Sequence, residues 1–264
     1  MRDAARLLPV LAVLCAALAG CATPPPASDP AALAAFKQTN DPLEPSNRVV
    51  YKINNAVDTA VLKPVAQGYV AVVPHVVRHH IGNVLDNLNE PVVLANDMMQ
   101  GKPRRAGDSL MRLLINSTAG VGGIFDVARR LGYPNHDTDF GITLALWGVH
   151  SGPYLYLPVL GPSGPRDLVG FGADIALDPF TWVGQGAAVA DLGYARYGVS
   201  AVNTRAQLLK PIDQIKRTAL DPYATFRSLY RQHRRAEVKA TRADNRATVP
   251  DWFPQPRTPQ PKTQ

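Results

Sequence analysis

The sequence predicts a single, mainly α-helical domain that contains one long irregular segment. Apolar residues between positions 45 and 116 recur at helical spacing, in segments separated by proline or glycine. The region from Gly120 to Pro179 is instead dense in glycine, proline and aromatic residues, and its apolar and polar residues do not alternate for long enough to favour a sheet. No repeat or internal linker divides the chain, which indicates one domain.

Residues 1–20 are typical of a secretory signal peptide. Arg2 and Arg6 precede an apolar run from Leu7 to Leu18. This run is shorter than the roughly 20 residues that cross a bilayer. The ending Leu-Ala-Gly-Cys resembles the lipobox of bacterial lipoproteins, in which Cys21 carries the lipid. An ordinary signal peptide with a chance cysteine is the alternative.

Residues 21–40 are expected to form a lipidated tether, because Thr23 to Pro30 (TPPPASDP) has the composition of an extended linker. The other cysteine, Cys15, lies within the signal. A chain lipidated at Cys21 therefore has no free thiol and no disulfide, which excludes a thiol enzyme and a cysteine metal site. Several acyl chains on one cysteine anchor a protein stably to a membrane.

Four helices are predicted before the irregular segment. The first is capped by Ser46 or Asn47 and the second begins after Pro74. Glu90-Pro91 begins a third, which ends at Gln100-Gly101. A fourth extends from about Arg105 to Asn116.

Helix is expected again from about Trp182 to Leu209, and the last helix has the strongest start signal. Asp221 supplies a cap and Pro222 the first turn, and aromatic and apolar residues follow at helical spacing. The helical domain is predicted to cover residues 41–246 and to end in a basic helix. The proline-rich residues 247–264 are predicted to be disordered.

The formal net charge of +7 is concentrated in that basic helix. A nucleic-acid-binding protein usually has a basic face on its folded domain, so no nucleic-acid partner is expected. In an exported lipoprotein, the basic helix either meets anionic lipid or an acidic protein surface, or is a solvated helix face.

The sequence lacks a convincing catalytic or cofactor motif. The segment Gly161-Pro-Ser163-Gly-Pro lacks the second glycine of a nucleophile elbow and is better explained as a turn. Gly120-Val-Gly122-Gly123 lacks the last glycine of a dinucleotide fingerprint and the lysine of a phosphate loop. His75 and His79 share a helix face, but no third metal ligand accompanies them. Neither a cofactor nor a metal is expected.

The stretch Ile115 to Asp126, INSTAGVGGIFD, is unusual because it places three glycines in an apolar region. Each glycine inside a helix costs roughly 1 kcal/mol relative to alanine. The apolar tracts from Leu113 to Ala128 and from Leu168 to Ala190 are not credible membrane spans. They are either ordinary core or helices that lie in the plane of a leaflet.

Several motifs, which follow one another in the same order as in the family over about 180 residues, resemble the MlaA/VacJ family of outer-membrane lipoproteins. They include Asp41-Pro-Leu-Glu44, Asn89-Glu-Pro91, Gly122-Gly-Ile-Phe-Asp-Val-Ala128, Gly152-Pro-Tyr154, Arg166-Asp167, Thr204-Arg-Ala-Gln-Leu-Leu209 and Asp221-Pro-Tyr223. Such a series of motifs is far more specific than a single glycine pattern.

The resemblance implies a ring-like helical body that lies in the inner leaflet of the outer membrane and contains an amphipathic channel. It implies a lipid-anchored, non-enzymatic protein on the periplasmic face. Such a protein removes mislocalised phospholipid from the outer leaflet, passes it to the periplasmic carrier MlaC, associates with a trimeric porin and maintains lipid asymmetry. A structural lipoprotein that scaffolds a porin or envelope complex is the alternative. An envelope esterase using Ser163 is a weaker third hypothesis.

The resemblance also suggests candidate site residues. The lipid-contact candidates are Tyr154, Tyr156, Leu157, Leu160 and Arg166, with Arg166 either binding phosphate or acting structurally. The hinge or gate candidates are Asn83, Val84, Gly120, Gly122, Gly123, Gly148 and Gly152. Departures from the family pattern at Ala145 and His150 put the flexibility of the hinge in question. The glycines near 120 are expected to form a membrane-embedded turn or a bend made for core packing.

Overall fold

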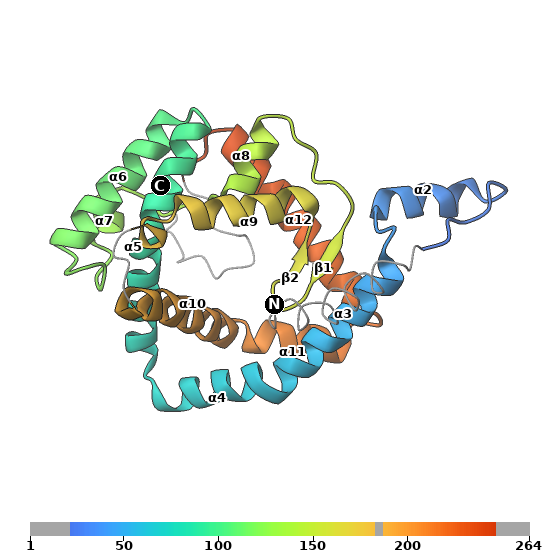
Figure 1. Ribbon diagram of the computed structural model, residues 1–264, viewed down its shortest axis with the longest axis horizontal. Coiled ribbons are helices and arrows are strands. Elements are labelled where there is room, and N and C mark those ends of the chain that lie inside the picture. The colour runs from blue at the N-terminus through green and yellow to red at the C-terminus, as the bar shows by residue number, and fades with distance from the viewer. Residues whose placement is uncertain (1–21, 183–186, 247–264) are drawn as a thin grey trace, which may run out of the picture.

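A computed structural model describes residues 22–182 and 187–246 of the chain. The predicted signal peptide, Cys21 and residues 247–264 lie outside the described residues. The described chain is mainly α-helical, as predicted (Figure 1). Its first elements are α2 (Pro30–Thr39), α3 (Glu44–Val57), the π-helical turn η1 (Asp58–Leu62), α4 (Lys63–Val72), α5 (His75–Met99) and α6 (Pro103–Thr118). They are followed by α7 (Val127–Arg130), α8 (Phe140–Leu146), β1 (Leu155–Leu157), β2 (Gly161–Ser163), α9 (Pro165–Leu177), the 3-10 turn η2 (Pro179–Thr181), α10 (Ala187–Gln207), α11 (Leu209–Thr218) and α12 (Pro222–Arg242).

Figure 1 shows these helices arranged as a ring, with α2 projecting from one side. The continuous rod of α3, η1 and α4 forms one side and α5 the next. Helix α5 packs on α6, and α8 packs on α9. Helix α12 contacts α8 and β2, while α10 packs along α4 and reaches α5. The last helix of the chain therefore packs against elements that lie much earlier in the sequence.

The boundaries of the first helices follow their proline residues. The extended backbone of Val73 ends α4, as expected for a residue before proline, and Pro74 caps α5. The first predicted helix begins at Glu44, slightly before the predicted caps. Residues 30–39, inside the predicted tether, form α2, which Asp29 caps by accepting a hydrogen bond from Ala32 N.

The predicted boundary at Glu90-Pro91 is wrong, because Pro91 lies inside the uninterrupted helix α5. Proline removes a backbone donor and usually breaks a helix. Here Glu90, Val92 and Val93 are all buried, and α5 packs on α6, α8 and α9. We attribute the continuity of the helix to this packing on both sides of the proline.

The Gly120–Pro179 region is less irregular than predicted. It contains α9 and an antiparallel pair in which Leu155 faces Ser163 and Leu157 faces Gly161. The glycines of α9 weakened the helix signal, but Gly170 has a packing role. A Cβ on Gly170 would lie 2.7 Å from Gly141 Cα, so glycine allows α9 to approach α8 closely.

The last helix begins as predicted. The Asp221 side chain accepts a hydrogen bond from Ala224 N, and Pro222 occupies the first turn. Helix α12 continues through the basic residues to Arg242.

Candidate functional site

The interior of this protein is unusually polar. Among the described residues, buried polar and charged side chains outnumber buried apolar ones. Charged side chains are rarely buried completely unless they are paired, yet Arg105 and Asp97 are both 0% exposed. This distribution is the reverse of that in a typical water-soluble domain.

One exposed face of the α3–η1–α4 rod is apolar. Exposed apolar residues recur every four positions, at Val49, Ile53, Val57, Val61 and Val65. A four-residue step advances about 40° beyond one turn of an α-helix, and the wider π-helical turn η1 counteracts this drift. The stripe continues across the bend to Val72, Val76 and Val77.

A second set of exposed apolar side chains lies on α6, on the turn that follows it and on α9. It consists of Leu110, Leu114, Val121, Ile124, Phe125, Leu168, Val169, Phe171 and Ile175. Large contiguous apolar surfaces mark contact with a membrane or with another protein. The exposed surfaces of the rod, α6 and α9 are therefore the candidate interaction surface.

Within the described ranges, no helix taken alone has the length and apolar character to cross a membrane. The segments Glu44–Val72 and His75–Met99 meet these criteria only as a pair, and that pair is bent by 119°.

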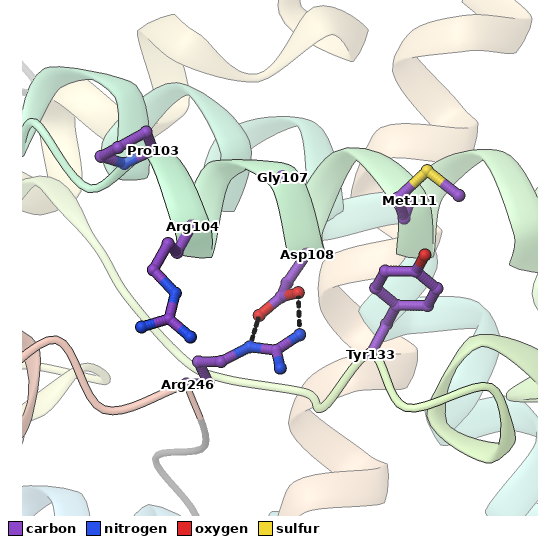
Figure 2. Close-up of a pocket in the computed structure, with 7 residues that line it drawn as sticks. All are labelled: Pro103, Arg104, Gly107, Asp108, Met111, Tyr133 and Arg246. Carbon is purple, nitrogen blue, oxygen red and sulfur yellow. Dashed lines mark hydrogen bonds and ion pairs between the residues drawn. The ribbon is translucent and has the colours of Figure 1, made fainter.

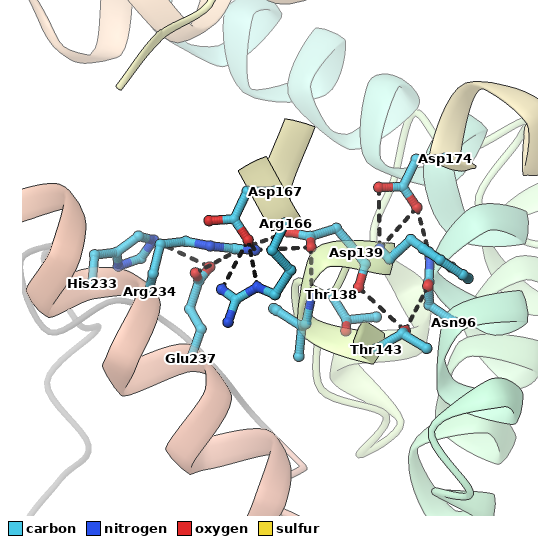
Figure 3. A network of polar contacts seen from close by, with 12 residues as sticks. Asn96, Thr138, Asp139, Thr143, Arg166, Asp167, Asp174, His233, Arg234 and Glu237 are labelled. Carbon is cyan, nitrogen blue, oxygen red and sulfur yellow. Dashed lines mark hydrogen bonds and ion pairs between the residues drawn. The ribbon is translucent and has the colours of Figure 1, made fainter. Parts of the chain in front are cut away.

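Arg234 of α12 organises an extended polar network (Figure 3). Its guanidinium donates to Asp139 Oδ2 at 2.7 Å and to Asp167 Oδ1 at 3.0 Å. Tyr230 donates to the other oxygen of Asp167. The two carboxylates raise the pKa of Arg234 against the opposing effect of burial. The network joins α12 to the start of α8 and to α9.

Asp174 of α9 lies in the same region, and neutral groups hydrogen-bond to its carboxylate. It accepts hydrogen bonds from Asn96 Nδ2 at 2.8 Å and from Phe140 N at 3.0 Å. Burial raises the pKa of Asp174 to about 6. Thr143 donates to Asn96 Oδ1 at 2.7 Å, which extends the network into α8.

A second network ties α5 and α6 to the turn between α6 and α7. Arg112 lies 3.4 Å from Glu90 and 3.2 Å from Asp126. Asn116 Nδ2 donates to Asp126 Oδ1 at 3.1 Å, and Asn116 Oδ1 accepts from Ala128 N at 2.9 Å. Burial raises the pKa of Glu90 to about 8.

Ser109, His136 and Asp97 come together in the interior without forming a catalytic triad. His136 Nε2 donates to Asp97 Oδ2 at 2.7 Å, and Ser109 Oγ donates to the same carboxylate oxygen at 2.8 Å. In a triad, the serine and the carboxylate would contact opposite ring nitrogens. All three side chains are fully buried, so no substrate can reach them. Ser163 is also buried and donates to Gly164 O at 3.3 Å.

Tyr154 and Tyr156 belong to an aromatic cluster between α3, the β-strands and α12. The ring centroids of Tyr51 and Tyr156 are 5.5 Å apart, and those of Tyr154 and Tyr223 are 6.1 Å apart. Tyr154 is 3% exposed, and Tyr223 donates to Asp41 at 2.6 Å. Burial raises the pKa of both Tyr154 and Tyr156. The cluster fixes the β-strands on the helices.

The other lipid-contact candidates lie apart from this cluster. Leu157 is half-buried in β1, whereas Leu160 is 51% exposed on the β1–β2 turn. Arg166 lies 2.8 Å from Asp167, in agreement with the structural alternative. The structure therefore does not gather the five candidates on one surface, and a lipid contact at Leu160 stays a prediction.

The glycines near position 120 lie in a tightly packed turn. A Cβ on Gly120 would lie 2.5 Å from Asn116 O, and one on Gly123 would lie 2.5 Å from Asn87 Cβ. Asn83 Nδ2 and His80 Nδ1 both donate to Ile124 O, at 3.1 and 2.8 Å. Val84 follows on α5 and is partly buried. Gly122 has a positive φ of 69° but open space around it.

Gly148 and Gly152 also have positive φ values, 94° and 72°. They lie on either side of the exposed residue His150. A Cβ on Gly152 would lie 3.0 Å from Pro165 Cδ, while Gly148 has open space. Ala145 is buried in α8. A hinge role for these glycines stays a prediction.

Most arginines of the basic helix contact groups elsewhere in the fold. Over most of its length, this helix is therefore neither a free surface for anionic lipid or an acidic protein nor a solvated helix face. Arg227 lies 2.6 Å from Asp41 and 3.0 Å from Glu44. Arg231 donates to Thr39 O. Arg235 and Lys239 remain on the exposed face.

The end of the described chain lies beside an open groove of about 390 Å³ on α6 (Figure 2). Arg246 pairs with Asp108 there, with Nε donating to Oδ2 at 2.7 Å. Met111 and Tyr133 supply apolar lining, and Arg104 extends from α6 at the rim. In the part of the chain that the structure describes, no group of His, Cys, Asp and Glu residues could hold a metal ion.

The inverted polarity was not evident from sequence. An apolar helical stripe looks the same whether it contacts a core or lipid. The informative signal was the pairing of that stripe with carboxylates and arginines at interior positions of α5 and α6, such as Asp97 and Arg105.

Comparison with known proteins identifies relatives along most of the chain. The model of the MlaA lipoprotein family matches residues 39–237. The intermembrane phospholipid transport system lipoprotein MlaA of Haemophilus influenzae is 36% identical over 221 residues, covering 81% of this chain and 86% of its own length. The Escherichia coli protein of the same name is 34% identical over 197 residues, covering 73% and 76%. An uncharacterized protein of Rickettsia bellii is 33% identical over 204 residues, covering 77% and 78%.

A solved structure, reported as the structural basis for maintenance of bacterial outer membrane lipid asymmetry, has a similar fold. It superposes with a TM-score of 0.65 at 32% sequence identity. The match covers 75% of this chain and 98% of that one.

Proposed function

Because this chain belongs to the MlaA lipoprotein family, we propose that it transports phospholipid between membranes and so maintains the lipid asymmetry of the outer membrane. The observation that carries this proposal is the polar interior combined with exposed apolar stripes. A phospholipid has a charged head group and apolar tails, so its movement requires both kinds of surface. No covalent chemistry is required, and the protein is not an enzyme.

The proposed location is the outer membrane, with the ring lying in the inner leaflet and Cys21 anchoring it from the periplasmic face. The apolar stripe on the α3–η1–α4 rod supports this orientation, because it would place one side of the helices in lipid. The proposed partners are a trimeric porin at the outer surface of the ring and the periplasmic carrier MlaC, which would accept phospholipid removed from the outer leaflet.

Deletion of the gene tests the transport function. We expect more phospholipid in the outer leaflet and greater sensitivity to detergent, both restored by the wild-type gene. Normal lipid asymmetry in a clean deletion strain would contradict the proposal.

Photo-crosslinking separates transport from the scaffold alternative. A photoreactive residue at Leu160, the exposed lipid-contact candidate on the β1–β2 turn, is expected to capture radiolabelled phospholipid that stays bound to the protein after purification in detergent. Ser228, which is exposed on α12, is the matched control. A scaffold would capture no phospholipid at either position.

A further inference from the structure

The groove on α6 lies where the described chain ends. Gly107, Asp108 and Met111 of α6 form its floor, with Tyr133 at one end and Arg104 at the other (Figure 2). Its volume of about 390 Å³ falls within the ~300–1,000 Å³ of typical binding pockets. A Cβ on Gly107 would meet no atom within 4 Å, so the middle of the floor is open. The groove therefore has room for side chains of another segment.

The chain is directed onto this groove where α12 ends. The backbone reverses at Asp244, which has a positive φ of 57°. Arg105 of α6 then donates to Asn245 O at 3.4 Å. Arg246 pairs with Asp108, with Nε 2.7 Å from Oδ2. Residues 247–264, which lie outside the described residues, are therefore attached to the wall of the groove.

The residues that follow Arg246 match the groove in their chemistry. The segment 247–253 has the sequence ATVPDWF, and Asp251 is the only acidic residue in 247–264. Arg104, at the rim, is exposed and has no hydrogen bond or ion pair within the part of the chain that the structure describes. A carboxylate is the partner that a guanidinium binds most strongly. Aromatic side chains such as Trp252 and Phe253 are the usual anchors of a peptide in a groove.

The segment is also long enough to occupy the groove. Five residue steps lead from Arg246 to Asp251, and an extended chain of that length spans ~17 Å. Helix α6 rises only ~12 Å between Pro103 and Met111. Proline at positions 250 and 254 disfavours a helix between them. An extended segment therefore reaches either end of the groove without any movement of α12.

We propose that residues 247–253 bind back in the α6 groove, with Asp251 paired to Arg104 and the two aromatic side chains packed against Met111. The groove is then a site for an extended peptide that carries aromatic side chains beside a carboxylate, and this chain supplies that peptide itself. The bound segment fastens the end of α12 to α6 and shields the ion pair between Asp108 and Arg246 from water. This inference does not rest on the proposed function.

Photo-crosslinking tests the position of the segment. Benzoylphenylalanine replaces Phe253 in the full chain, purified in detergent. Because benzophenone reacts preferentially with methionine, we expect mass spectrometry to find it joined to Met111 of the same chain. Gly107→Leu fills the floor of the groove and should abolish this product. Gly107→Ala, the matched control, adds one methyl group to open space and should retain it.

Three results of this experiment would overturn the proposal. They are the absence of a product on α6, an equal yield in the Gly107→Leu variant, and capture only of lipid or of a second copy of the chain. Mixing chains of normal and heavy isotopic composition distinguishes capture within one chain from capture between two.

A charge exchange tests the pairing of Asp251 with Arg104. Arg104→Asp places two carboxylates together and should reduce the crosslink to Met111 several-fold. Adding Asp251→Arg restores opposite charges and should restore the crosslink. A double variant that crosslinks no better than Arg104→Asp alone would overturn the pairing.

Oxidation of methionine gives an independent measurement. In a Trp252→Ala, Phe253→Ala double variant of the full chain, hydrogen peroxide should oxidise Met111 several-fold faster than in the wild type, because the aromatic side chains no longer cover it. Met98, which is 67% exposed on α5, is the internal control and should react at the same rate in both proteins. Equal rates at Met111 would overturn the proposal. None of these measurements depends on transport, so a strain with normal lipid asymmetry would refute the proposed function without affecting them.

Discussion

Arg234 and Asp139 form a direct link between the last helix and the first turn of α8, with Nη1 2.7 Å from Oδ2. Asp139 also caps α8 by accepting from Ile142 N at 2.9 Å. One carboxylate therefore starts a helix and holds another helix against it.

Arg234→Ala should strongly destabilise the fold, because it leaves Asp139 and Asp167 beside each other without their shared cation. Removing one partner of a buried ion pair costs about 3–5 kcal/mol; partial exposure of Asp139 points to the lower end. Chemical denaturation in detergent measures the change. Arg235→Ala, on the exposed face of the same helix, is the control and should change stability by less than about 0.5 kcal/mol. Equal losses in the two variants would show that the network does not stabilise the protein.

Because the pKa of Asp174 is raised in the folded state, the free energy of unfolding should fall as pH rises. The pKa is raised to about 6 from an ordinary value of 3.8, so the folded state binds this proton more tightly than the unfolded state between those pH values. The stabilisation is complete below pH 4 and is lost as pH rises to 6. Asp174→Asn retains an acceptor and removes this dependence. Relative to wild type, the variant should gain about 1–2 kcal/mol between pH 4 and pH 7, after allowance for solvent screening. A constant difference in unfolding free energy across this range would contradict the assignment.

The three glycines of the 119–125 turn should differ in their tolerance of alanine. Gly120→Ala and Gly123→Ala place a Cβ against Asn116 O and Asn87, and each should cost about 2–4 kcal/mol. Gly122→Ala meets no neighbouring atom and should cost about 1 kcal/mol, from backbone conformation alone. Gly107, in the interior of α6 with open space, is the control, and Gly107→Ala should stabilise slightly. Melting temperatures of the four variants test this order; a flexible hinge would tolerate all three turn substitutions alike.

Asn47→Ala should loosen the β-strands. Asn47 Nδ2 donates to Asp41 Oδ1 and Tyr154 O, and its Oδ1 accepts from Tyr156 N at 2.9 Å. Its loss leaves buried groups unpaired, at a cost of about 2–3 kcal/mol. Hydrogen exchange at Tyr156 N should become faster. Asn55→Ala, a neighbouring position with no hydrogen bond to these strands, is the control. Unchanged exchange in the Asn47 variant would show that the aromatic cluster alone holds the strands.

Local signals predicted local features of the fold. Asp221-Pro222 marked the start of α12 and Pro74 the start of α5, because capping and proline geometry depend on adjacent residues. Glu90-Pro91 misled because packing across α5 outweighs the missing hydrogen bond. Helix α9 was not predicted, because Gly170 weakens the helix signal. The reason for a glycine there is its close packing on Gly141, which is distant in sequence.

The sequence predicted less of the candidate site than of the fold. Family motifs suggested the 119–125 glycines as hinge or gate candidates, but gave no sign of the close packing of Gly120 against Asn116 and of Gly123 against Asn87. Tyr154 was predicted to offer amphipathic surface, yet Tyr223 and Tyr230 of α12 pack against it. The partners of each side chain are distant in sequence, so no local pattern indicates them.

The long reach of α12 has a consequence for the order in which the chain can fold. Arg227 contacts Asp41 across 186 positions, and Arg246 contacts Asp108 across 138. Contacts between distant positions form slowly, because the intervening chain must be ordered first. The ion pairs at Asp41 and Asp108 cannot form until residues 227–246 are present and have reached the first helices. The last helix therefore joins the two ends of the ring only after the earlier helices are in place.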